Sequence, residues 1–496
     1  MAHISAAIDS TRQQWGEAGV WHCGGGSTSG RALHDAVVRV SGALTARLGC
    51  RIGDRVGLLG LNTPEYQAAV LAAADAGAIV CPLNWRWSPA ELAAALALVA
   101  PALVFVDTPC LALLQSVADG QHGCPRFTTV LLTPIDAVVW PAAETLGQQA
   151  CFVSSCCLAD LLTSPQQEQE HASGSGAVAA AAPTSQLQLL QPPDGAALIC
   201  FTSGTTSAPK GAVLTHAALL HQSMAKLAVV GYCRGDTYLH VAPLCHIGGL
   251  SSALAALLAG AQQVFMPRYS AAEAVRLVSH HRVTALIAVP TMMEDMVAHL
   301  AAGAGQTDNR AQQRHGTATG SGCLPSVLRV LVGGGGMRPR LVPMSSNGGD
   351  AVGQGGACVG VPAPGVQVVI AVGGAPETGG SGRGSSCLVG GEAGPAVVGE
   401  VLTRGPHVMS RYWADPEQTQ QALLPSGWLR TGDLGWLDTQ GRLWLLGRAK
   451  DTVKSGGENV HAAEVEAALE SHPAVAAAAV VGLPHKRLGE VSKGSH

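Results

Sequence analysis

Short apolar runs that alternate with helix-start signals fill the first hundred residues and constrain the fold class most strongly. The runs at 56–61, 78–81 and 102–106 have the length and composition of buried strands. Between them, Thr63-Pro64-Glu65 and Ser88-Pro89-Ala90-Glu91 each combine a capping hydroxyl with a proline in the first turn, as helices commonly begin. This alternation predicts an α/β fold with a mainly parallel sheet covered by helices.

The length of the chain predicts more than one folded unit. Its 496 residues are 47% apolar, which is enough for two or more cores. The composition changes after Gly447, where charged residues precede a helical pattern at 462–470. We therefore expect a large N-terminal domain over 1–447 and a small C-terminal lobe over 448–496. Four stretches contain too little apolar surface to fold and are expected to be loop or disordered insertions: 166–186, 302–322, 345–357 and 373–394.

Charge and cysteine usage argue against several functional classes. The formal net charge is −4, with 30 basic and 34 acidic residues, so there is no general electrostatic reason to bind nucleic acid. The apolar stretch at 92–106 is too short for a membrane span and contains Pro101. Residues 1–14 lack the apolar core of a signal peptide. The 14 cysteines show no paired spacing, so we expect reduced thiols in an intracellular, reducing compartment.

A run of hydroxyls, glycines and one lysine follows the strand-like stretch at 197–201. Residues 202–211 read Thr-Ser-Gly-Thr-Thr-Ser-Ala-Pro-Lys-Gly, and their backbone N–H groups, hydroxyls and positive charge suit a polyphosphate. Gly211 stands where a P-loop NTPase has the Ser or Thr that holds magnesium, so that class is disfavoured. A surface linker is the alternative, but a patterned helix follows at 217–229. The candidate phosphate-binding residues are Thr202, Ser203, Gly204, Thr205, Thr206 and Lys210.

Four further segments contain candidate site residues. His246 precedes a glycine pair and an apolar helix, where it could shape a pocket for an acidic substrate or serve as a structural histidine. The glycines at 334–336 follow a strand-like pair, and bare backbone there would let a flat ring approach, although a loop explains them equally well. Asp433 could hold two ribose hydroxyls or be a turn residue. The charged segment 447–459 could also be a solvated linker.

In this order, these segments resemble the adenylate-forming superfamily of acyl-CoA synthetases, luciferases and peptide-synthetase adenylation domains. The resemblance spans nearly the whole chain outside the insertions, and it implies the adenylate-forming enzyme fold, with a large domain of helix-covered sheets and a small α+β lobe. The segments that carry it are the phosphate-binding run, 243–249, the glycine run, Thr431-Gly-Asp433 and Gly447-Arg448. Three segments resemble more narrowly the plant-type o-succinylbenzoate–CoA ligases of phylloquinone biosynthesis: 82–88, 238–252 and 403–413.

The resemblance implies a two-step ligation that uses ATP, Mg²⁺ and CoA. A carboxylate attacks the α-phosphorus of ATP, which gives an acyl-adenylate and pyrophosphate, and CoA thiolate then displaces AMP. The implied partners are therefore a small carboxylic acid, ATP and CoA, and the implied compartment is the chloroplast or peroxisome.

The resemblance also implies roles for individual residues. Lys210 and His246 would be the catalytic residues, with the run from Thr202 to Lys210 on the β- and γ-phosphates and His246 beside the acyl group. The hinge between the half-reactions would be Lys450. The metal ligands are unknown. The remaining assignments are Gly334, Gly335 and Gly336 in the adenine and acyl pocket, Asp433 and Arg448 on the ribose, and Ser455, Gly456, Gly457, Glu458 and Asn459 in the loop for the CoA step.

The sequence departs from the family's pattern in two places. The family's Tyr-Gly-x-Thr-Glu motif, whose tyrosine stacks on adenine and whose glutamate helps hold magnesium, is absent where 345–350 read Ser-Ser-Asn-Gly-Gly-Asp. A strand of the second sheet is expected to be lost with it. The segment 480–490 matches the start of the small lobe's sheet, but neither Lys486 nor Lys493 matches the family's terminal lysine. We expect an open sheet edge there, prone to aggregation, and a loss of rate by orders of magnitude.

Three hypotheses therefore stay open. The chain could be an o-succinylbenzoate–CoA ligase in an incomplete form, a truncated and catalytically impaired nucleotide- or acyl-binding variant, or a ligase for another aryl or fatty acid.

Overall fold

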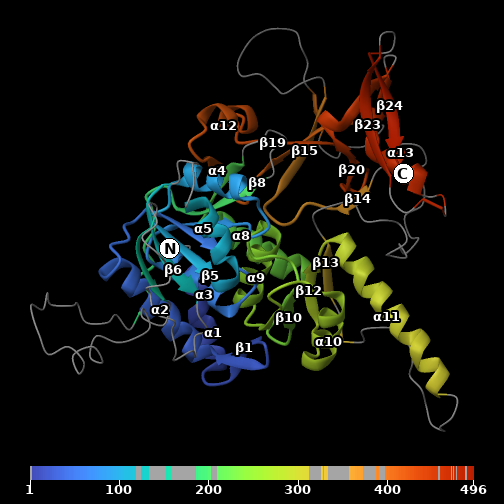
Figure 1. Ribbon diagram of the computed structural model, residues 1–496. Helices are drawn as coiled ribbons and strands as arrows, with labels where there is room; N and C mark the ends of the chain where they lie inside the picture. The colour runs from blue at the N-terminus through green and yellow to red at the C-terminus, as the bar shows by residue number, and fades with distance from the viewer. Residues whose placement is uncertain are drawn as a thin grey trace, which may run out of the picture. The chain divides into compact units, whose positions relative to one another are not determined.

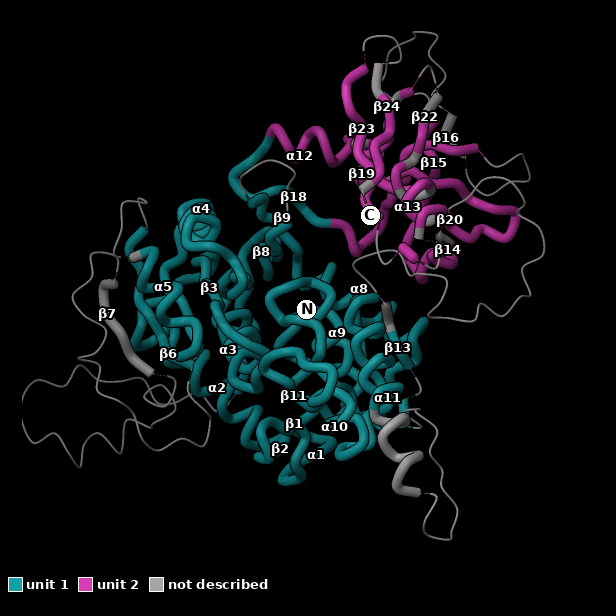
Figure 2. Tube along the Cα trace, turned by 45° about the vertical axis from the view of Figure 1, so that its right-hand side comes forward, with its two compact units in different colours: residues 1–334, 409–416 teal, residues 335–408, 417–496 magenta. Residues whose placement is uncertain are grey.

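The computed structural model contains two compact units (Figure 2). The first unit comprises residues 1–334 and 409–416, and the second comprises 335–408 and 417–496. The domain boundary after Gly447, expected from composition, stays a prediction. The structure describes residues 3–118, 125–132, 152–157, 186–202, 209–311, 326–327, 329–332, 357–372, 387–389, 397–455, 458–470, 472, 474–475, 478–485 and 489–495.

An eight-stranded sheet forms the centre of the first unit, in the order β18-β9-β8-β4-β3-β5-β6-β7 (Figure 1). Its strands from β8 to β7 run parallel, whereas β9 and β18 are antiparallel to their neighbours. The prediction of a mainly parallel sheet is confirmed. The strand bounds are β3 (Arg55–Leu59), β4 (Ile79–Leu83), β5 (Leu103–Asp107), β6 (Phe127–Leu132), β7 (Phe152–Cys157), β8 (Ala196–Thr202), β9 (Lys210–Thr215) and β18 (Arg411–Tyr412).

The two faces of this sheet are covered by different helices. Along β5, Leu103 and Phe105 pack in a cluster with residues of α2 (Gly30–Ala46) and α3 (Pro64–Asp75). The alternate residues Val104 and Val106 pack in another cluster with residues of α4 (Pro89–Val99) and α5 (Leu111–Ala118). Successive side chains of a strand point to opposite faces, so a strand buried on both sides reads as a continuous apolar run.

The helices begin at their predicted capping residues. Thr63 accepts a hydrogen bond from the N–H of Tyr66 and caps α3. Ser88 and Glu91 bond reciprocally in a capping box at the start of α4. The predicted helix at 217–229 is α8 (His216–Val230), which follows β9 directly. These local signals confirm the predicted order of strands and helices.

A second, six-stranded sheet of the first unit has the order β13-β12-β10-β11-β1-β2. In the described part of the chain, β13 forms one edge of this sheet, shortly before the sequence departs from the family's pattern. The strands are β1 (Gly19–Cys23), β2 (Gly26–Ser29), β10 (Thr237–His240), β11 (Gln262–Phe265), β12 (Ala285–Ala288) and β13 (Arg329–Val332). The remaining helices of eight or more residues described in this unit are α1 (Ala7–Trp15), α9 (Ile247–Leu258), α10 (Ala271–His281) and α11 (Pro290–Ala311).

Two of the four stretches predicted to be loop or disordered insertions contain regular secondary structure. The helix α11 continues through Ala311, so a loop from 302 is wrong for ten residues. Extending an existing helix adds one backbone hydrogen bond for each residue fixed, which offsets the low helix propensity of Gly303 and Gly305. Inside the fourth stretch, β16 (Cys387–Val389) pairs with β15 (Gln367–Val372). Apart from Gln186 and Ala357 at their borders, the other residues of these stretches lie outside the described residues.

The second unit contains two antiparallel sheets. The larger has the order β14-β20-β19-β17-β15-β16, and the smaller has the order β22-β21-β24-β23. The helix predicted at 462–470 is confirmed as α13 (Ala462–Glu470). No described helix has the length and apolar character needed to cross a membrane. The remaining bounds are β14 (Ala357–Gly360), β17 (Gly399–Arg404), β19 (Leu429–Leu437), β20 (Leu443–Arg448), β21 (Thr452–Ser455), β22 (Glu458–His461), β23 (Ala479–His485), β24 (Gly489–Ser495) and α12 (Pro416–Ala422).

Buried histidines predict an acid-sensitive fold. The rings of His3 and His216 stack with their centroids 3.9 Å apart, and burial lowers the pKa of His216 to about 3, with a further contribution from His3. The unfolded state, with a pKa near 6.5, therefore binds more protons between pH 6.5 and 3. The free energy of unfolding should be fully retained above pH 6.5 and fall by up to ~1.4 kcal/mol per pH unit for this group below it.

Urea unfolding of wild-type and His216→Gln proteins at several pH values measures this contribution. The variant should show a shallower loss of stability between pH 6.5 and 4, whereas His299→Gln, on an exposed position of α11, should retain the wild-type slope. Equal slopes in all three proteins would contradict the assignment to His216.

Candidate active site

The predicted phosphate-binding run joins two antiparallel strands. Thr202 ends β8 and Lys210 begins β9, and these two residues pair with each other across the strands. Because β8 is a buried interior strand of the sheet, the backbone at both ends of the run is fixed by strand pairing. Residues 203–208 lie outside the described residues, so the roles of Ser203, Gly204, Thr205 and Thr206 stay predictions.

Gly211, which follows the lysine, is explained by packing. A Cβ at this position would stand 2.6 Å from Ile199 Cγ2 on the neighbouring strand β8, closer than such atoms approach. The side chain of Lys210 lies near Tyr412 of β18, with Nζ 5.9 Å from the ring centroid, which is within the range of a cation–π contact. The glycine that separates this run from a P-loop therefore leaves room for the Ile199 side chain.

His246 stands at the N-cap of α9. Its side chain does not cap the helix, and its Nε2 lies 3.4 Å from Asn84 Nδ2. Although His246 is exposed, surrounding protein partly desolvates the ring, and this desolvation, followed by the positive charge of Arg86, lowers its pKa. A neutral imidazole at pH 7 can accept a hydrogen bond at one nitrogen and donate one at the other.

Asn62, which sequence reasoning did not identify, fixes the loop that carries His246. Its buried side-chain amide donates to the carbonyls of His240 and Ala242, and its Oδ1 accepts from the N–H of Leu244 at 2.8 Å. All three partners lie about 180 residues away along the chain, so no local pattern could have indicated them. Asn62 is therefore a positioning residue for the turn between β10 and α9.

The second unit brings together the two residues predicted to hold the ribose. Asp433 on β19 and Arg448 on β20 are paired in register, and Arg448 Nε lies 2.9 Å from Asp433 Oδ1. Arg448 Nη1 also donates to the Thr431 carbonyl, and Thr431 Oγ1 accepts from the N–H of Asp433. Desolvation raises the pKa of Asp433, while Arg448 and Thr431 act in the opposite direction. The result is a carboxylate held in a fixed orientation.

The other predicted site residues are described only in part. The backbone of Lys450 lies in a 3₁₀ turn (Ala449–Asp451), and Ser455 ends β21, paired with Glu458 of β22. The side chains of Lys450, Glu458 and Asn459 lie outside the described residues, as do Gly334, Gly335, Gly336, Gly456 and Gly457. Their roles stay predictions.

The part of the chain that the structure describes contains no cluster of metal ligands. Within the described ranges, no group of three or more His, Cys, Asp or Glu side chains could hold a metal ion. The glutamate of the family's Tyr-Gly-x-Thr-Glu motif is also absent from the sequence.

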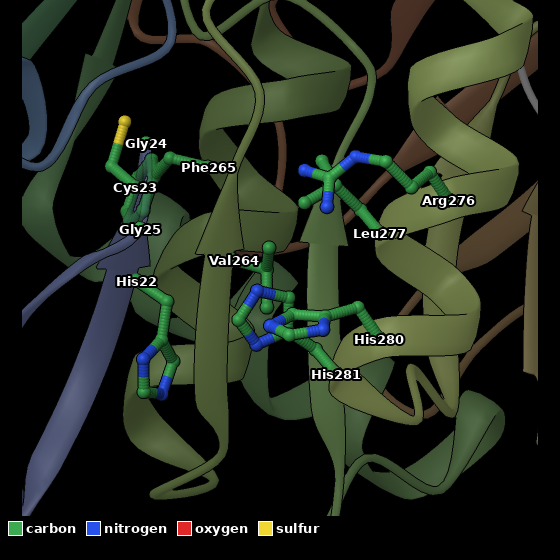
Figure 3. A pocket seen from close by; sticks show the side chains of 10 residues that line it. All are labelled: His22, Cys23, Gly24, Gly25, Val264, Phe265, Arg276, Leu277, His280 and His281. Carbon is green, nitrogen blue, oxygen red and sulfur yellow. The ribbon is translucent and has the colours of Figure 1, made fainter.

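A small cavity lies apart from the predicted site residues (Figure 3). His22 of β1 and His280 and His281 of α10 line it, and the ring centroids of His22 and His281 are 5.2 Å apart. Burial lowers the pKa of His22, and desolvation, followed by His22, His280 and Arg276, lowers that of His281. The Arg276 guanidinium that also lines it is paired with Glu273.

Comparison with known proteins identifies the family. The family model described as AMP-binding enzyme matches residues 9–413, and that described as AMP-binding enzyme C-terminal domain matches 464–495. The 2-succinylbenzoate–CoA ligase, chloroplastic/peroxisomal, of Arabidopsis thaliana is 32% identical, covering 93% of this chain and 79% of that protein. Indoleacetate–CoA ligase of Aromatoleum aromaticum is also 32% identical, with coverage of 92% and 81%.

Solved structures show the same fold. ATP-bound MatB from Rhodopseudomonas palustris has a TM-score of 0.72 at 24% identity, covering 99% of this chain and 88% of that one. The o-succinylbenzoate CoA synthetase from Bacillus subtilis in complex with its acyl-adenylate has a TM-score of 0.68 at 22% identity, with coverage of 98% and 87%. From the family matches, the relatives and this fold, we conclude that the chain belongs to the AMP-binding enzyme family of adenylate-forming enzymes and is an acid–thiol ligase.

Proposed function

We propose that this ligase converts 2-succinylbenzoate to its CoA thioester, with ATP and CoA as co-substrates, in phylloquinone biosynthesis. One observation carries the proposal: two segments of the narrower resemblance, 82–88 and 238–252, meet where Asn84 approaches His246. The identity of 32% with the Arabidopsis thaliana 2-succinylbenzoate–CoA ligase over 93% of the chain supports it. A plastid or peroxisomal location follows from the same relative and is part of the proposal.

The reaction would proceed in two displacements. A substrate carboxylate oxygen attacks the α-phosphorus of ATP, and the bond from that phosphorus to the pyrophosphate oxygen breaks. The thiolate sulfur of CoA then attacks the acyl carbon of the mixed anhydride, and the bond from that carbon to the AMP oxygen breaks. The first displacement gives a poor acyl donor a good leaving group.

The chain's own residues would bind and orient these groups. Lys210 and the run that precedes it would bind the β- and γ-phosphates, because a positive charge and inward N–H groups favour polyphosphate. Neutral His246 at the N-terminus of α9, where the helix carries a partial positive charge, would orient the acyl carboxylate. Asp433, oriented by Arg448, would accept hydrogen bonds from the ribose hydroxyls.

Pyrophosphate exchange with a panel of acids tests the substrate. We expect kcat/KM for 2-succinylbenzoate to exceed that for indoleacetate, ferulate and a fatty acid by at least about tenfold, because a site that pairs with polar groups rejects acids lacking them. Thioester formation with CoA, followed by mass spectrometry, should give the same order. A higher value for one of the other acids would identify a ligase for that acid instead.

An impaired nucleotide-binding variant is the second candidate. The observation that favours it is the absence of the Tyr-Gly-x-Thr-Glu motif between the glycine run and β14. Calorimetric binding of ATP without exchange for any acid of the panel would support this candidate. Lys210→Ala protein should then lose ATP binding, and full adenylation by that variant would contradict the assignment of the phosphate-binding run.

A further inference from the structure

Lys226 belongs to α8, and its side chain reaches α9. These two helices pack together (Figure 1). Its Nζ donates to Ser251 Oγ at 2.5 Å and to Ser252 Oγ at 2.9 Å. Ser251 in turn donates to the carbonyl of Ile247 in the first turn of α9. The ammonium group of Lys226 on α8 is thus held by two serine hydroxyls of α9.

The partners of Lys226 leave its charge uncompensated. Hydroxyl oxygens can accept its N–H groups, but among the described residues no carboxylate forms an ion pair with it. Burial lowers the pKa of Lys226 to about 8, and no neighbouring charge is among the causes. Buried charges in proteins are normally paired, so a desolvated ammonium held only by hydroxyls is suited to an anionic ligand group.

This cluster lies close to His246 along α9, with Ser251 and Ser252 buried and with Gly248 and Lys226 partly exposed. Ser252 is six residues after His246, which corresponds to about 9 Å along the helix axis. Gly248, one turn before Ser252 on the same face, leaves room there, because a Cβ would meet only Ile287 Cδ1 within 4 Å, at 3.8 Å. A small acid whose activated carboxylate lies at His246 could therefore extend along this face.

We propose that Lys226, with Ser251 and Ser252, recognises a second carboxylate of the acid, the one that is not activated. The inference rests on the proposed function, since 2-succinylbenzoate carries one carboxylate on its ring and another on its succinyl chain. After one carboxylate enters the mixed anhydride, the other keeps its charge and needs a counter-charge. Lys226 supplies that counter-charge, and its hydrogen bond to Ser252 holds its ammonium group in place. Lys226 is therefore a residue that determines specificity.

Paired substrates test this role without relying on overall activity. Kinetics of adenylation are measured with 2-succinylbenzoate and with two analogues that each lack one carboxylate, 3-benzoylpropanoate and 2-butanoylbenzoate. Lys226→Met should lower kcat/KM for 2-succinylbenzoate by about 10- to 100-fold, mainly through KM, because a charge-assisted hydrogen bond is lost. The better analogue should change less than about threefold, and Lys226→Arg should restore part of the preference for the dicarboxylate.

The controls separate recognition from folding. Met224→Ala, on the same helix at an exposed position, should leave both substrates unchanged. An equal loss for dicarboxylate and analogue in Lys226→Met, or no loss, would overturn the inference alone, provided that the wild-type enzyme activates 2-succinylbenzoate. Failure of the wild-type enzyme to activate 2-succinylbenzoate would overturn the proposed function and this inference together.

Discussion

Replacing Asp433 by alanine should weaken ATP binding about 100-fold, because hydrogen bonds from ribose hydroxyls to a charged carboxylate contribute about 1.5–3 kcal/mol each. The carboxylate is held ready for this by Arg448, whose Nε lies 2.9 Å away. Its removal also leaves that guanidinium without its ion-pair partner. Calorimetric titration with ATP measures the affinity, and pyrophosphate exchange should fall in parallel.

Asp438 offers a matched control in the hairpin between β19 and β20. It too accepts hydrogen bonds from an arginine, Arg442, and it also accepts from Trp444 Nε1 and from the N–H of Gln440. These bonds hold the pKa of Asp438 at about 2, against an opposing contribution from desolvation. Asp438→Ala should therefore lower the melting temperature yet leave ATP affinity within about threefold. An equal loss of ATP affinity in both variants would show that Asp433 acts only on the fold.

Gly249→Ala should be the most damaging small substitution in the turn that carries His246. A Cβ would stand 2.3 Å from the Pro243 carbonyl oxygen and 2.9 Å from that of Ala242, and neither backbone atom can rotate away. We expect a loss of about 2–4 kcal/mol in unfolding free energy. Displacement of His246 should lower adenylation by about 100-fold or more in the fraction that folds.

Gly248→Ala is the paired control for this substitution. Its Cβ would meet only Ile287 Cδ1 at 3.8 Å, an ordinary contact, so its melting temperature should stay close to that of the wild type. Denaturation followed by circular dichroism distinguishes the two variants by their stability. Equal stability of the two alanine variants would show that the close approach of the Pro243 carbonyl does not require glycine at position 249.

Elements with local signals could be predicted from the sequence. Thr63 and Ser88 mark helix starts because their hydroxyls bond to N–H groups three residues ahead, within the same short segment. By contrast, β18 is two residues long and exists through its pairing with β9, about two hundred residues earlier. Strand pairing over such a distance depends on tertiary packing, which no window of sequence contains.

The candidate site divides in the same way. Asp433 and Arg448 were predicted through the family resemblance, and the hairpin that brings them together needs only the turn between two adjacent strands. Lys226 was missed because a lysine in a helix is ordinarily solvated. Its desolvation appears only when α9 packs against α8 and presents Ser251 and Ser252. The desolvation of a charged side chain depends on the helix that packs over it, so the sequence alone does not reveal it.

The return of residues 409–416 to the first unit limits how the protein can be dissected. There the N–H of Trp413 bonds to the carbonyl of Gly211 and that of Ser410 to the carbonyl of Val213, which completes the outer side of β9. A gene fragment ending near 334 would omit this short stretch, and the strand that starts at Lys210 would present unpaired amides to other molecules. Expression of the first unit by itself therefore requires a gene in which residues 409–416 are joined to the segment ending near 334.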